Sequence, residues 1–169
     1  MKPYQRVALR FAKRHTLEYS TQVDFDSIEL EVELDGEIIG EVMAGIKDYE
    51  IEEIDIEKFS VLNPCSDDIM ELLSYLGGEL LERNGKVRIV EVLSSELNES
   101  MKGHGIGYQM YLKVAQEAFD MNKRMPFLFL PNYCSGHSTS DEALRVWKSL
   151  ARKYPSSGDV IAIRHRPSK

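Results

Sequence analysis

The stretch Val87–Phe119, VRIVEVLSSELNESMKGHGIGYQMYLKVAQEAF, decides the fold. Its β-branched apolar start predicts a buried strand, within residues 87–97. A polar linker and a glycine-rich turn follow, and apolar residues then recur at helical spacing: Ile106, Met110, Val114 and Ala118. The stretch therefore predicts a strand, a glycine loop and a helix. Such a loop presents unpaired backbone N–H groups and a partial positive charge, which favours a bound phosphate.

The spacing of the glycines discriminates between phosphate-binding motifs. A dinucleotide fingerprint would require a glycine at Tyr108, and a Walker A loop would require Gly-Lys-Ser/Thr where the chain has Gly107-Tyr108-Gln109. The remaining pattern is a basic residue followed by Gly-x-Gly: Lys102, Gly105 and Gly107. An ordinary strand–turn–helix is the alternative, but three alternate glycines exceed what one turn needs.

This pattern resembles the coenzyme A pyrophosphate loop of the GNAT acetyltransferase superfamily, written Gln/Arg-x-x-Gly-x-Gly/Ala, with Lys102 in the place of Gln or Arg. The resemblance is specific from Val87 to Leu150 and topological elsewhere. It implies an α/β protein of the α+β mixed-sheet kind: a GNAT-like acyl-CoA N-acyltransferase fold, with a central mixed β-sheet and helices on both faces. It also implies acetyl-CoA as co-substrate.

The rest of the chain is expected to complete one domain, residues 1–169. Alternation predicts a strand over residues 28–34, a hairpin turn at Asp35-Gly36 and a returning strand over residues 37–46. The other expected elements are helices over residues 3–14, 67–83 and 141–153, an extended segment over 49–61, and strands over 126–131 and 160–163.

Composition bounds the class of protein. The net charge is −7, and no apolar run approaches the roughly 20 residues of a membrane span. Cys65 and Cys134 have no metal-ligand spacing, so we expect a cytoplasmic protein without a metal. Between Asp24 and Glu57 there are fourteen acidic residues and one basic residue, which favours a cationic partner or, equally, a solvated sheet face.

The resemblance implies that acetyl-CoA lies between strands 87–97 and 126–131. Its pantetheine arm would pair with backbone groups of Ser95, Glu96 and Leu97, where an N–H would stabilise the tetrahedral oxyanion. The residues expected to hold the pyrophosphate are those of the loop and helix start: Lys102, Gly103, His104, Gly105, Ile106, Gly107 and Tyr108.

An amine with a pKa of about 10.4 must lose a proton before it attacks a thioester. Some family members place a glutamate six residues before the end of the pantetheine-pairing strand, and this position holds Glu91. Glu91 is therefore the expected base; its structural alternatives are an ion pair to Arg88 or a solvated position at the end of the strand. Glu96 is a weaker candidate, because a regular strand would place it on the opposite face.

The family often uses a tyrosine on the last helix to protonate the leaving thiolate. Here that position holds Trp147, whose indole cannot act as an acid, so Trp147 is expected in the core or as a wall of the cleft. Tyr133 and Tyr154 are the candidate replacements, and Tyr154 is the one that we expect to be catalytic. Tyr133, His137 and Trp147 are expected on the substrate side.

The leading hypothesis is an N-acetyltransferase that moves an acetyl group from acetyl-CoA to a primary amine, on a protein lysine or N-terminus or on a small cationic amine. The alternative is a catalytically degenerate GNAT-fold module that binds coenzyme A or a protein partner without turnover. No membrane is expected as a partner, and the overall charge disfavours nucleic acid. The sequence leaves a homodimer open.

Overall fold

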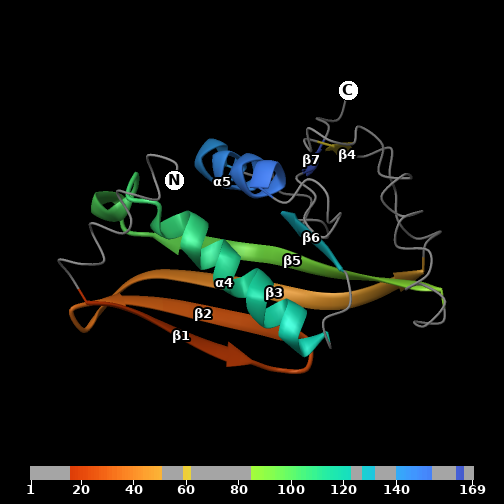
Figure 1. Ribbon diagram of the computed structural model, residues 1–169, viewed down its shortest axis with the longest axis horizontal. Helices are drawn as coiled ribbons and strands as arrows, with labels where there is room; N and C mark the ends of the chain where they lie inside the picture. Colours follow the sequence, from red (N-terminus) through yellow and green to blue (C-terminus); the bar gives the residue numbers. More distant parts are fainter. Residues whose placement is uncertain are drawn as a thin grey trace.

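The computed structural model describes residues 16–50, 59–61, 85–122, 127–131, 140–153 and 163–165. Its centre is a five-stranded sheet in the order β1-β2-β3-β5-β6 (Figure 1). The strands are β1 (Leu17–Val23), β2 (Ser27–Leu34), β3 (Glu37–Glu50), β5 (Lys86–Leu97) and β6 (Leu128–Pro131). The first four are antiparallel, and β6 pairs in parallel with β5. With the helices α4 (Ile106–Met121) and α5 (Asp141–Lys153), this is an α+β fold.

The antiparallel hairpin β2–β3 forms where the alternating pattern predicts it. Ile28, Leu30 and Val32 are buried, and the intervening residues of β2 point to the other face. The turn between the strands has positive φ angles at Asp35 (51°) and Gly36 (89°), as a two-residue hairpin of this kind requires. The predicted strand over residues 28–34 and its turn are confirmed.

Strand β1 was not predicted, and it pairs with β2 along its whole length, from Leu17 opposite Leu34 to Val23 opposite Ile28. The predicted extended segment 49–61 is wrong as one element. Residues 49 and 50 end β3, whereas β4 (Phe59–Val61) pairs with β7 (Ile163–His165) in a separate two-stranded sheet. The predicted helices over residues 3–14 and 67–83 lie outside the described residues.

Two β-bulges reset which side chains face the core. Opposite β2, Ile39 is the extra residue of β3: Val32 pairs with Gly40 and Glu33 with Ile38. Ile39 therefore turns into the core, while Ile38 is 50% exposed, although regular alternation back from the buried Val42 would place Ile38 inward and Ile39 outward.

The second bulge lies in β5, where Met43 pairs with Ser94 but Ala44 pairs with Val92, which leaves Leu93 as the extra residue. We call the sheet side that faces α4, with Val92 and Ser95, the inner face, and the opposite side the outer face. The bulge places Glu91 on the outer face and Ser95 on the inner face. It also brings Glu96 to the outer face, so the prediction that Glu91 and Glu96 face opposite sides is wrong.

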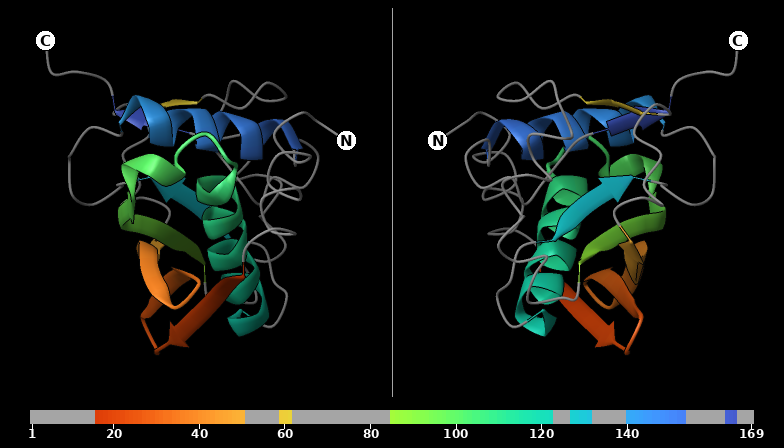
Figure 2. Two further views of the ribbon diagram at one scale, coloured as in Figure 1. Left: turned by 90° about the vertical axis from the view of Figure 1, so that its left-hand side faces the viewer. Right: turned by 90° about the vertical axis from the view of Figure 1, so that its right-hand side faces the viewer.

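Helices α4 and α5 pack on the inner face. The predicted stripe of α4 is buried at Ile106, Met110, Val114 and Ala118, against β2 and β3. Trp147 of α5 is fully buried, and its ring meets the rings of Tyr111 and Phe129 at centroid distances of 5.2 and 4.7 Å. Figure 2, which looks along the sheet, shows α4 covering one side of the strands. Among the described elements no helix covers the outer face, so the expected helices on both faces are not shown.

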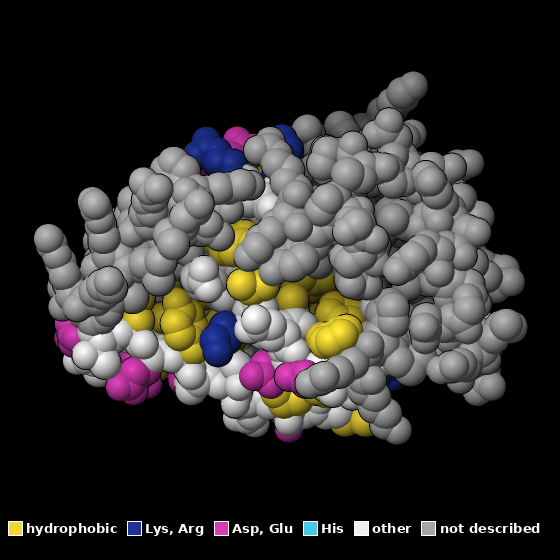
Figure 3. Space-filling view, viewed as in Figure 1, with side chains coloured by type: hydrophobic (Ala, Val, Ile, Leu, Met, Phe, Trp, Pro, Cys, Tyr) yellow, Lys and Arg dark blue, Asp and Glu magenta, His cyan; other side chains and the backbone are white. Residues whose placement is uncertain are grey.

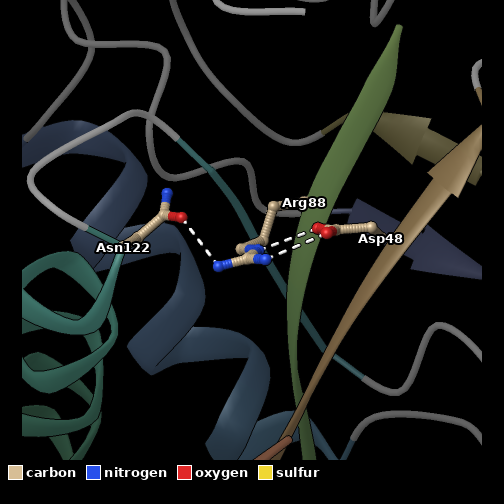
Figure 4. A network of polar contacts seen from close by, with 3 residues as sticks. All are labelled: Asp48, Arg88 and Asn122. Atoms are coloured by element: carbon tan, nitrogen blue, oxygen red, sulfur yellow. Dashed lines mark hydrogen bonds and ion pairs between the residues drawn. The ribbon is translucent and has the colours of Figure 1, made fainter. Parts of the chain in front are cut away.

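A polar network ties the far end of α4 to the sheet (Figure 4). Arg88 of β5 donates two hydrogen bonds to the carboxylate of Asp48 on β3, at 2.8 and 2.9 Å, and one to Asn122 Oδ1, at 2.9 Å. The hydrogen bond to Asp48, partly opposed by burial, raises the pKa of Arg88. Arg88 faces the inner side and pairs with Asp48, whereas Glu91 faces the outer side, so the alternative ion pair between Glu91 and Arg88 is wrong.

Candidate functional site

A cleft of about 730 Å³ opens where β5 ends, between the glycine loop, the start of α4 and one side of α5. All the residues expected to contact the cofactor line this cleft except His104. Figure 3 shows hydrophobic side chains exposed near the middle of one face of the molecule. Lys and Arg side chains lie at the upper edge of this face, where α5 lies in Figure 1. The structure thus brings together the end of the predicted strand, the glycine loop and the start of the predicted helix.

The cleft exists because β5 continues beyond its partner. Strand β6 pairs with β5 from Ile89 opposite Leu128 to Val92 opposite Pro131, and β5 then runs on to Leu97. Along that last part, β5 pairs with β3 on one side, and no other strand in the described ranges pairs with its other side. The edge of β5 that borders the cleft is therefore the kind of backbone to which an extended ligand can add. The bulge at Leu93 lies where the two parallel strands separate.

The glycine loop is held in a conformation that only glycine adopts readily. Gly103 and Gly105 have φ angles of +82° and +79°, which strain any residue with a Cβ atom. Gly105 is the N-cap of α4, and among the described residues no side chain makes a capping hydrogen bond at this helix end. The first hydrogen bond of the helix runs from Gln109 N to Gly105 O at 3.2 Å, so the backbone N–H groups before Gln109 are not used inside the helix. The loop and helix start can bind an anion.

Two cations line the cleft that this glycine loop borders. Lys102 lies 2.6 Å from Glu99, and the hydrogen bond to Glu99 raises the pKa of Lys102, with a smaller contribution from Glu142. Lys102 therefore carries its charge at neutral pH. Arg145 of α5 also lines the cleft, and the sequence analysis missed it. Its signal was spacing: Glu142, Arg145 and Ser149 follow one another at three and four residues, which places them on one side of a helix.

The floor of the cleft contains a hydrogen bond between β5 and α4. Ser95 Oγ and the hydroxyl of Tyr111 lie 2.8 Å apart, and both residues line the cleft. Burial raises the pKa of Tyr111, and the hydrogen bond to Ser95 opposes this rise. The contact joins the edge of β5 to the helix that follows the glycine loop, so it holds the two walls of the cleft together.

We expect Tyr111→Phe to lower the free energy of unfolding by about 1 kcal/mol at neutral pH, because it removes this hydrogen bond. The difference between wild type and variant should narrow above about pH 10, where tyrosine ionises in the unfolded chain but not in the folded one. Urea unfolding at neutral and alkaline pH measures both effects. Equal stability at neutral pH, or a difference that does not change at alkaline pH, would contradict the expectation.

The expected base is buried but does not line the cleft. Glu91 is 4% exposed and points to the outer face, opposite Gly45 of β3 and Leu130 of β6. Of the residues at the end of β5 that line the cleft, Ser95 faces inward and Glu96 faces outward, as Glu91 does, and the bulge at Leu93 lies between Glu91 and both of them. The structure therefore separates the expected base from the expected cofactor site along β5, across the bulge.

Of the predicted acid and substrate-side residues, the structure describes only Trp147. Trp147 is fully buried and does not line it, so of its two expected places the structure has the core and not the cleft wall. Tyr133, His137 and Tyr154 lie outside the described residues, as does Cys134. Within the described ranges, no three His, Cys, Asp or Glu side chains come together as metal ligands.

The described helices include none that is both long and apolar enough to cross a membrane. No protein-family model matches the chain, and a comparison with curated proteins found no match. In the described part of the chain, fold and site together define an α+β protein with a cleft bordered by the edge of β5, the glycine loop and the start of α4.

Proposed function

We propose that this chain is a GNAT-like N-acetyltransferase, which transfers an acetyl group from acetyl-CoA to a primary amine. The observation that carries the proposal is the lining of the cleft. Residues chosen from a sequence pattern for coenzyme A binding, on β5, on the glycine loop and on α4, border a single cavity. Its volume, about 730 Å³, lies in the range of known small-molecule and cofactor pockets.

The chemistry of the lining suits an acyl-CoA. The pyrophosphate would accept hydrogen bonds from the amides of the loop and of the first turn of α4, with Lys102 and Arg145 supplying positive charge. The pantetheine arm would lie along the β5 edge, against the apolar side chains of Leu97, Met110 and Val146. Glu96 adds negative charge, which we assign to the acceptor side of the cleft, whereas Glu142 lies close enough to Lys102 to raise its pKa and so belongs to the loop side.

In this proposal, Glu91 removes a proton from the bound ammonium group, directly or through water, and the free amine attacks the thioester carbonyl. A backbone N–H of β5 beyond the bulge stabilises the negative charge on the carbonyl oxygen. The C–S bond then breaks and the acetyl group remains on nitrogen, which gives its second proton to water. The sulfur departs as a thiolate, which a thiol pKa of about 8.5 permits. In this proposal the amine approaches from the outer face of β5, where Glu91 lies, and the thioester is held at the edge of the same strand.

The experiment is to incubate the protein with acetyl-CoA and a panel of amines: lysine-containing peptides, free peptide N-termini and polyamines. Release of free thiol that depends on an amine, together with an acetylated product in the mass spectrum, is the expected result. Thiol release at the same rate with and without each amine would contradict the proposal.

One observation favours the alternative, a module that binds coenzyme A without turnover. The position of the usual acid holds Trp147, which is buried in the core and has no proton to give to a thiolate. Binding of acetyl-CoA with no product from any amine in the panel would favour that alternative.

A further inference from the structure

The register of the sheet brings glutamates opposite one another on the outer face. Glu31 of β2 pairs with Glu41 of β3, and Glu41 pairs in turn with Glu96 of β5. Two residues further along β2, on the same face, Glu33 pairs with Glu18 of β1. Like charges directly opposite each other destabilise a sheet, and the carboxylates of the row from Glu31 to Glu96 are exposed to solvent. A bound cationic group would relieve this repulsion.

Three apolar side chains lie among these carboxylates. Ile38 and Met43 of β3 are 50% and 41% exposed, and both face outward because they pair with outward-facing residues of β2. Leu93 at the bulge is 42% exposed and lies beside Gly45, where a Cβ atom would be 3.3 Å from Leu93 Cδ1. A sheet face that only meets water carries polar residues at such positions. The mixture of exposed carboxylates and apolar side chains is that of a binding surface.

The acidic row leads to the cleft. Glu96 belongs both to the row and to the lining of the cleft, so the outer face and the proposed cofactor site share one residue at the end of β5. Glu91, the expected base, lies on the same face, where it pairs with Leu130 of β6. Among the described residues of the sheet, the outer face carries one cation, Lys47, which lies over the ring of Tyr49 at the opposite end of β3 from the hairpin turn.

We propose that the outer face docks a polypeptide segment rich in Lys and Arg with apolar residues between them. The further step, that this segment carries the acceptor amine and presents it on the outer face of β5 between Glu96 and Glu91, rests on the proposed function. Charge complementarity to Glu31, Glu41 and Glu96 attracts the segment, and contact with Ile38, Met43 and Leu93 adds apolar area.

The dimensions of the face favour a polypeptide over a small polyamine. Neighbouring strands are about 4.8 Å apart, so the row from Glu31 to Glu96 spans roughly 10 Å, while Ile38 and Met43 lie about 16 Å apart along β3. A polyamine that spans the roughly 10 Å row would contact the carboxylates and leave Ile38 and Met43 exposed to water. A second copy of this chain would bring an equally acidic face, which repels.

The test is fluorescence anisotropy with a labelled peptide of alternating Lys and Val, in the absence of acetyl-CoA. We expect Glu31→Gln with Glu41→Gln to weaken binding roughly tenfold. The matched control is Glu37→Gln with Glu117→Gln, which removes the same charge from a strand position facing inward, opposite Leu34, and from α4. A second variant, Ile38→Ser with Met43→Ser, keeps the charge and should also weaken binding. Circular dichroism verifies that each variant is folded.

The outcomes separate the docking surface from acetyl transfer. Equal loss in both Glu pairs would mean attraction by net charge alone and would overturn the proposal. So would an unchanged affinity in the Ile38–Met43 variant, or full displacement of the peptide by spermine, because either result identifies the surface as one for small cations. Peptide binding without acetylation in the presence of acetyl-CoA would support the docking surface and count against the acceptor role. Acetylation of small amines without peptide binding would overturn the docking surface alone.

Discussion

Trp147→Ala should lower the free energy of unfolding by about 3–5 kcal/mol, a large part of the 5–15 kcal/mol that stabilises an ordinary domain. Trp147 is fully buried and lies between Tyr111 of α4 and Phe129 of β6. Removing the indole therefore leaves a cavity where both helices and the parallel strand meet, and it also removes two aromatic contacts. Denaturant unfolding measures the loss.

Two control variants test whether this loss of stability comes from the burial of the ring. Trp147→Phe keeps an aromatic ring at the same place and should cost clearly less than the alanine variant. Phe25→Ala removes an equally apolar ring, but Phe25 is 96% exposed, so its effect should stay within about 0.5 kcal/mol. A loss of less than about 1 kcal/mol in Trp147→Ala would contradict the placement of this side chain in the core.

Glu91→Gln should lower turnover by about 10²–10⁴-fold, because glutamine keeps the shape of the side chain but cannot accept the ammonium proton. Affinity for acetyl-CoA should change little, since Glu91 points to the outer face and does not line the cleft. Single-turnover acetylation of the best amine in the panel, together with a separate measurement of acetyl-CoA binding, distinguishes the two effects.

The control for this variant is Glu96→Gln, the same change on the same face of β5. Glu96→Gln should raise KM for a cationic acceptor and leave kcat close to that of wild type, because Glu96 is proposed to attract the acceptor and not to take its proton. If Glu96→Gln lost turnover while Glu91→Gln kept it, the base would be Glu96. Full turnover in both would remove each of them from the mechanism.

Long elements with one strong periodicity could be predicted from the sequence. The stripe of α4 is buried as its spacing indicates, and α5 begins and ends at the predicted residues Asp141 and Lys153. Ser140 begins α5 by accepting a hydrogen bond on its hydroxyl from Ala143 N at 3.2 Å. Strand β1 was missed because it lies at the edge of the sheet, where most of its side chains face solvent and its pattern is weak.

The bulges could not be predicted, and they matter most for the site. Leu93 and Ile39 are ordinary apolar residues within apolar runs, so no local signal marks either as an extra residue. Their positions follow from pairing between strands, which a single sequence does not contain. By contrast, the end of β5 and the glycine loop are consecutive in the chain, so a single sequence pattern predicts that they lie together. Arg145 joins them only through the packing of α5, which that pattern does not contain.

Calorimetric titration with acetyl-CoA tests the assignment of the cleft most directly. Wild type should bind with a saturable heat, and Gly105→Glu should abolish binding, because a carboxylate would replace the anion at the start of α4. Gly36→Glu is the matched control: Gly36 also has a positive φ, with open space around its Cβ position, but it lies in the β2–β3 turn. Binding by wild type and Gly36→Glu but not by Gly105→Glu is the predicted result. No binding by wild type, or equal binding by all three folded proteins, would contradict a coenzyme A site in this cleft.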